Sequence, residues 1–127
     1  MRIGDLIDGR FRVEARAGSG AMGVVFRARD GLDGSAVALK TWHDDGVSPA
    51  NRFLREAAAL ARLSEPAVVR YVAHGLSERS RPYLAMEWVE GQTLAERLAA
   101  GGLTPLETLE LGERLLQGLA ALHAHGI

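Results

Sequence analysis

Three glycines and one lysine near the start of the chain carry the clearest chemical pattern in the sequence. Gly18, Gly20 and Gly23 follow G-x-G-x-x-G spacing, and Lys40 comes seventeen residues after the last of them. Lys40 is the only lysine beside fourteen arginines. Glycine has no Cβ and lets the backbone approach a ligand closely, and an ammonium is a compact partner for a phosphate oxygen. The pattern predicts a site for the phosphates of a nucleotide.

The glycine spacing alone does not define the kind of phosphate site, because glycines also mark ordinary turns. In a dinucleotide-binding unit the glycines open a helix, whereas here Val24, Val25 and Phe26 follow and favour a strand. A phosphate loop of the Walker type needs a Gly-Lys pair, which the sequence lacks. The remaining interpretation is a β-hairpin whose glycine-rich tip lies over the phosphates.

The elements that must position these residues change from strands to helices along the chain. Alternating apolar residues and Asp-Gly turns predict strands, and apolar residues at helical spacing predict helices. The predicted strands span 11–18, 23–30, 36–42, 67–75 and 81–89, and the predicted helices span 48–63, 93–100 and about 105–124. The first strand is expected to place four apolar residues on one face: Phe11, Val13, Ala15 and Ala17.

Capping residues mark the expected starts of the helices. Ser48 is the expected N-cap of the first helix and is followed by proline, which suits the first helical position. Thr93 with Glu96, and Thr104 with Glu107, have the spacing of a capping box. The order of elements is therefore three strands, a helix, two strands and two helices.

The glycine motif with Val25, followed by the run Val-Ala-Leu-Lys that ends at Lys40, resembles the N-terminal lobe of the protein kinase superfamily. The stretch GAMGVVFRARD is most similar to bacterial eukaryotic-like serine/threonine protein kinases, and the resemblance covers essentially the whole chain. It implies an α+β fold, a five-stranded antiparallel sheet with one packed helix, followed by helices of a truncated C-terminal lobe. Residues 1–91 would form the N-terminal lobe with its hinge, and residues 92–127 the first helices of an incomplete C-terminal lobe.

The resemblance assigns the phosphate contacts of ATP. The loop that would cover the phosphates comprises Gly18, Ser19, Gly20 and Gly23. Lys40 would contact the α- and β-phosphates and pair with Glu56, the single glutamate of the predicted helix 48–63. A planar guanidinium is larger and has a different shape, so arginine would not replace Lys40 cleanly. A solvated Glu56, paired with Arg52, is the alternative.

The resemblance also assigns the adenine contacts. The stretch YLAMEWVEG, residues 83–91, is similar to the kinase hinge. Met86 would guard the back of the adenine pocket, and the backbone of Glu87 and Val89 would bond the adenine edge. Val25 and Ala38 would pack on its faces, a role compatible with ordinary strand packing. A threonine, residue 93, stands where many family members have an acidic ribose contact.

Composition limits the function classes. The chain has 127 residues, a net charge of −1 and no cysteine. These values give no electrostatic case for nucleic acid or an anionic membrane, and they exclude a disulfide scaffold, Cys-ligated zinc and thiol catalysis. The charged N-terminus is unlike a signal peptide, and no apolar run approaches the length of a membrane-spanning helix. We expect a cytoplasmic protein without a membrane segment.

The sequence contains neither a His-Arg-Asp catalytic loop nor an Asp-Phe-Gly metal motif. In the complete kinases that the chain resembles, these motifs supply the base and the Mg²⁺ ligands for phosphoryl transfer to a protein substrate. The chain is therefore expected to be the ATP-binding front half of a serine/threonine kinase, and inactive alone. Two alternatives stay open: a non-catalytic, pseudokinase-like nucleotide-binding or docking module, and a purely structural interaction domain.

Overall fold

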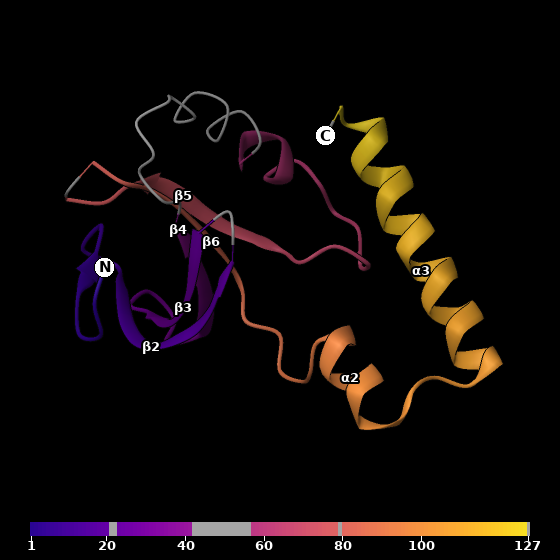
Figure 1. The fold of residues 1–127 in the computed structure, drawn as a ribbon. Coiled ribbons are helices and arrows are strands. Elements are labelled where there is room, and N and C mark those ends of the chain that lie inside the picture. The colour runs from indigo at the N-terminus through magenta and orange to yellow at the C-terminus, as the bar shows by residue number, and fades with distance from the viewer. Residues whose placement is uncertain (21–22, 42–56, 79, 127) are drawn as a thin grey trace.

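The computed structural model describes residues 1–20, 23–41, 57–78 and 80–126. A curved antiparallel sheet forms one part of the molecule, and two helices follow it along the chain (Figure 1). The later of these helices, α3, stands beside the loop that leads into β5, while the N-terminus lies against the sheet. The α+β class expected from the sequence is confirmed.

The sheet has six strands in the order β1-β2-β3-β4-β6-β5, and every neighbouring pair is antiparallel. The strands are β1 Leu6–Ile7, β2 Phe11–Gly20, β3 Gly23–Asp30, β4 Ala36–Thr41, β5 Tyr71–Leu76 and β6 Pro82–Glu87. The prediction of five strands was one short, because β1 has only two residues and exists through its pairing with β2.

Two register shifts bend β2. They fall between Val13 and Ala15 and between Arg16 and Gly18, where the partner strand β3 continues without interruption. A bulge of this kind changes which face the following side chains occupy. Val13 is buried, but Ala15 and Ala17 are exposed. The prediction that all four apolar residues of this strand share one face was therefore wrong beyond Val13.

The main core lies on one face of the sheet. It is built from residues of five strands, namely Ile7, Phe11, Val13, Phe26, Ala28, Val37, Leu39, Tyr83 and Ala85. The Tyr83 ring meets Phe11 edge-on at 5.9 Å between centroids, and its hydroxyl donates to Asp8 Oδ2 at 2.6 Å. Burial and this hydrogen bond raise the pKa of the Tyr83 phenol. The N-terminal segment is thereby fixed to β6.

The strand β5 begins later than the predicted strand 67–75. The Glu65 carboxylate accepts from Ala67 N at 3.1 Å, and the Glu65 carbonyl accepts from Val68 N at 2.9 Å. These bonds hold a turn, so regular pairing starts only at Tyr71. Of the predicted helix 48–63, residues 57–60 are helical. The predicted N-cap Ser48 lies outside the described residues.

Both capping boxes of the later helices are confirmed. α2 spans Leu94–Gly101, with Thr93 as N-cap and Glu96 as its reciprocal partner. α3 spans Pro105–Ala124, with Thr104 and Glu107 in the same roles. α3 rests on the loop before β5 at Gly118, where an added Cβ would lie 3.4 Å from Ala67. Gly118 therefore marks the point where α3 meets the loop before β5.

Candidate nucleotide site

The strand register places the glycine motif and the lysine in one row across the sheet. Gly18 on β2 lies opposite Val25 on β3, Val25 lies opposite Lys40 on β4, and Lys40 lies opposite Leu84 on β6. Directly opposite residues of antiparallel strands project to the same face. The predicted phosphate residues Gly18 and Lys40, and the predicted adenine contact Val25, are therefore neighbours on one face.

A second row lies one step along the same face. Arg27 on β3 is opposite Ala38 on β4, and Ala38 is opposite Met86 on β6. Two predicted adenine contacts, Ala38 and Met86, are thus also brought together with Val25. All three side chains are half-buried.

The alternation along β4 explains why this face is available. Val37, Leu39 and Thr41 are buried, while Ala38 and Lys40 between them are half-buried. Val37 and Leu39 belong to the main core. Because side chains alternate along a strand, Lys40 projects away from that core.

The glycine motif lies where the end of β2 pairs with the start of β3. Gly20 pairs with Gly23, and Gly23 has a φ of 147°, a conformation that favours glycine. Gly18, Ser19 and Gly20 are exposed. A Cβ added at Gly18 or Gly20 would meet no atom within 4 Å. Packing among the described residues therefore does not require glycine at these two positions, whereas a ligand that came close to the backbone would favour it.

Ala57, the residue after Glu56, packs on the face of the sheet that carries Lys40. Glu56 itself lies outside the described residues, so the predicted Lys40–Glu56 pair stays a prediction. Ala57, which follows it, is buried against Leu84, and Leu84 is the direct neighbour of Lys40 on β6. The helical residues 57–60 thus pack on the same face of the sheet as the lysine.

The segment after β6 lines a pocket. Ala17 on β2 forms one wall, and residues 88–93 with Glu96 form the other, around a volume of about 370 Å³. Val89, a predicted adenine contact, lies in this lining and is exposed. Ala17 and Trp88 were not predicted as site residues. Their positions next to Gly18 and between Glu87 and Val89 are the signals that could have identified them.

The backbone of Glu87 is held by the strand-like segment before β5. Glu87 N donates to Arg70 O at 2.9 Å, and Arg70 N donates to Glu87 Oε1 at 2.8 Å. The backbone N–H of Glu87 is therefore already engaged in a hydrogen bond with the Arg70 carbonyl. Any contact of this residue with a ligand falls to its carbonyl oxygen.

Thr93 has a structural task at the edge of the pocket. Its backbone N–H and its hydroxyl donate to Glu96 Oε2 at 2.6 and 2.8 Å, and its hydroxyl accepts from Glu96 N at 3.2 Å. The hydrogen bond from the Thr93 backbone lowers the pKa of Glu96. Helix capping therefore accounts for both side chains.

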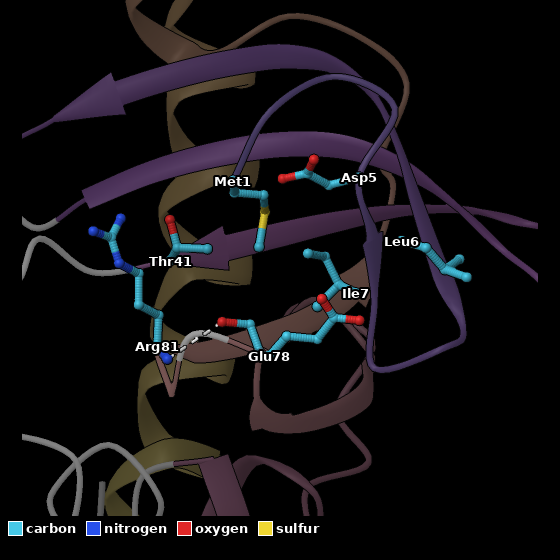
Figure 2. A pocket seen from close by; sticks show the side chains of 8 residues that line it. Met1, Asp5, Leu6, Ile7, Thr41, Glu78 and Arg81 are labelled. Atoms are coloured by element: carbon cyan, nitrogen blue, oxygen red, sulfur yellow. Dashed lines mark hydrogen bonds between the residues drawn. The ribbon is translucent and has the colours of Figure 1, made fainter.

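A second pocket, of about 220 Å³, lies away from these rows (Figure 2). Met1, Asp5 and Ile7 approach it from the N-terminal segment, Thr41 from the end of β4, and Arg81 from the turn before β6. None of the predicted site residues lines it.

Residues 11–127 match the family model of the protein kinase domain. The chain belongs to the protein kinase family. A serine/threonine-protein kinase of Myxococcus xanthus, pkn2, is 42% identical over 125 residues, which cover 96% of this chain and 15% of pkn2. The serine/threonine-protein kinase PrkC of Bacillus subtilis is 36% identical over 129 residues, covering 98% of this chain and 19% of PrkC. The kinase chain thus spans less than a fifth of the length of these two relatives.

Solved structures show the same fold. The kinase domain of PknI from Mycobacterium tuberculosis matches with a TM-score of 0.83 at 23% identity, covering all of this chain and 54% of that one. None of the helices within the described residues of this kinase chain is long and apolar enough to cross a membrane.

Proposed function

We propose that residues 1–127 form the ATP-binding part of a serine/threonine protein kinase, which transfers the γ-phosphate of ATP to a protein hydroxyl. The register that sets Gly18, Val25 and Lys40 side by side carries this proposal. The family and the printed names of the bacterial relatives support it. Within the chain, residues 1–91 act as the nucleotide-binding lobe with its hinge, and residues 92–127 begin the second lobe.

Phosphate binding falls to the glycine-rich turn and Lys40. Gly18, Ser19, Gly20 and Gly23 cover the phosphates with their backbone, because the exposed Gly18, Ser19 and Gly20 have no side chain, or a small one, in the way. The Lys40 ammonium pairs with the α- and β-phosphates, and Glu56 orients it. Together they hold the nucleotide so that its terminal phosphate is positioned for transfer.

The adenine base occupies the pocket between β2 and the segment after β6. Val25 and Ala38 pack on its faces, and Met86 closes the back. The carbonyl of Glu87 and the backbone of Val89 bond its edge. The pocket between Ala17 and Val89 supports this placement, because it opens between the glycine-rich strand and the hinge.

Kinases generally use Mg²⁺ with ATP to neutralise charge on the transferred phosphate. No group of three His, Asp or Glu residues among the described residues is arranged to hold a metal ion. We therefore assign no step of this chain's chemistry to the metal. The partners we propose are ATP and a protein substrate, in the cytoplasm, where ATP is available.

Phosphotransfer by the full-length gene product tests the proposal. Wild type and Lys40→Met are compared for transfer of labelled γ-phosphate from ATP to a protein substrate. Loss of an electrostatic contact to the transferring phosphates costs about 10²–10³-fold in rate, and we expect a loss of at least that size. Arg12→Met is the matched control, because Arg12 is an exposed basic residue on β2.

Equal transfer by wild type and Lys40→Met would overturn the role given to Lys40. Nucleotide binding by a wild type that transfers no phosphate would instead favour a non-catalytic nucleotide-binding module. An equal loss in Arg12→Met would show that any charge removal disturbs the protein.

A further inference from the structure

Arg27 contacts both the strand that carries the glycine motif and the segment that follows β6. Its Nη1 donates to Glu14 Oε2 on β2. The centre of its guanidinium lies 5.7 Å from the centroid of the Trp88 ring, within the range of a cation–π contact. Trp88 Nε1 in turn donates to Glu90 Oε1 at 2.9 Å. A continuous series of contacts therefore runs from Glu14 to Glu90.

The register explains how one side chain spans this distance. β4 lies between β3 and β6, and its residue directly opposite Arg27 is Ala38. Both side chains project to the same face. Arg27 therefore reaches across one strand, β4, to contact Trp88 just beyond the end of β6.

The two ends of this series lie on the two segments that line the candidate nucleotide pocket. Ala17 lies three residues beyond Glu14 on β2 and lines one wall, while Trp88 and Val89 line the other. Arg27 is two-thirds buried, with a side-chain exposure of 33%, and Glu14 has 26%. Contacts that are partly shielded from water hold geometry better than fully exposed ones. Arg27 therefore links the two segments that form the walls.

We propose that Arg27 is a positioning residue for nucleotide binding. By holding Glu14 and Trp88 together, it fixes the glycine-rich strand and the hinge at the separation that admits a planar purine base. This inference rests on the proposed function. Arg27 acts through the two walls and makes no contact with the reacting phosphate, so its loss weakens binding of ATP more than it slows transfer.

Steady-state kinetics of the full-length gene product test the proposal. Arg27→Gln removes the cation and keeps a polar side chain. We expect its KM for ATP to rise about three- to tenfold, the size of one cation–π contact, with kcat changed less than about twofold. Arg27→Lys keeps a cation that reaches Glu14 and the ring, and should restore at least half of the lost affinity.

Arg29→Gln is the matched control. Arg29 Nε also donates to Glu14, at 2.6 Å, but its other hydrogen bond goes to the Gly34 carbonyl in the β3–β4 turn. Its removal should leave the KM for ATP within about twofold of wild type. The same rise in both variants would overturn the proposal, because it would show a general effect of losing a Glu14 partner.

Trp88 variants give an independent measurement, also if Arg27→Gln does not fold. Trp88→Leu should raise the KM as Arg27→Gln does, and Trp88→Phe, which keeps an aromatic face, should raise it less. The double variant Arg27→Gln with Trp88→Leu should be no worse than the poorer single variant. Additive effects, or a Trp88→Leu variant that matches wild type, would overturn the coupling.

Lys40→Met separates this inference from the proposed function. If Lys40→Met abolishes phosphotransfer while the Arg27 and Trp88 variants match wild type, only the positioning role fails. If Lys40→Met matches wild type, the proposed function itself fails.

Discussion

The carboxylate of Asp30 shows how a single buried residue ties the first hairpins together. Asp30 is 2% exposed and accepts from Arg10 Nε at 2.8 Å and from Arg10 Nη2 at 2.6 Å. Leu32 N also donates to it at 3.0 Å. The bonds from Arg10 lower the pKa of Asp30, against the opposing effect of burial. The start of β2 is thereby fixed to the turn that precedes β4.

Replacing Arg10 with Met should destabilise the protein by about 1–3 kcal/mol at pH 7, because a buried carboxylate loses two donors. The pKa of Asp30 is lower in the folded than in the unfolded chain, where it is about 3.9. Stability from this pair is therefore fully present above that pH and is lost as the pH falls through the folded pKa. Urea unfolding of wild type and Arg10→Met at several pH values measures the difference.

The gap between the two proteins should stay constant near neutral pH and shrink below about pH 4. Arg12→Met, a change at an exposed position, should match wild type throughout. A gap that is absent at pH 7, or that widens in acid, would be inconsistent with a stabilising Arg10–Asp30 pair.

At the scale of elements, local chemistry made much of the fold predictable. The strand 23–30 has the predicted limits, and both helix caps are where Thr93 and Thr104 indicated. The register shifts in β2 and the two-residue β1 were not predictable, because each depends on a partner strand rather than on its own residues. Reading a longer stretch of the sequence around each strand does not reveal which strand it pairs with, or in which register.

In the candidate site, too, positions within one strand were predictable and contacts between strands were not. Alternation along β4 is enough to place Ala38 and Lys40 on one face. The contact between Arg27 and Trp88 was not predictable, because these residues lie on elements that are brought together only by the sheet order β3-β4-β6.

The packing of α3 at Gly118 gives a prediction at this scale. An added Cβ would lie 3.4 Å from Ala67 and 3.5 Å from Val68, which is ordinary contact. Gly118→Ala should therefore be neutral or stabilise by up to about 1 kcal/mol through helix propensity. Gly118→Leu should separate the helix from the loop, seen as faster hydrogen exchange in residues 65–70. Equal exchange in both variants would argue against this contact.

At the scale of the whole molecule, α3 presents an apolar surface to solvent. Five of its leucines are exposed, namely Leu106, Leu109, Leu115, Leu116 and Leu119. Burying each would contribute roughly 1.5–3 kcal/mol relative to exposure. A contiguous apolar stripe of this kind favours association.

We expect residues 1–127, expressed alone, to self-associate through α3 or to aggregate. The double variant Leu109→Gln with Leu116→Gln should shift the protein toward monomer. A chain ending near Gly101 should be more soluble. Sedimentation velocity over a range of concentrations measures both effects. A stable wild-type monomer with α3 fully protected from hydrogen exchange would contradict this expectation.

In the function proposed above, the row from Gly18 to Lys40 binds the phosphates of ATP. Calorimetric titration of the full-length gene product with ATP and with adenosine tests it most directly, because only ATP carries phosphates. We expect Lys40→Met to weaken ATP binding by at least about tenfold and to leave adenosine binding within about twofold of wild type. Equal affinities of wild type and Lys40→Met for ATP, or equal losses for both ligands, would contradict it.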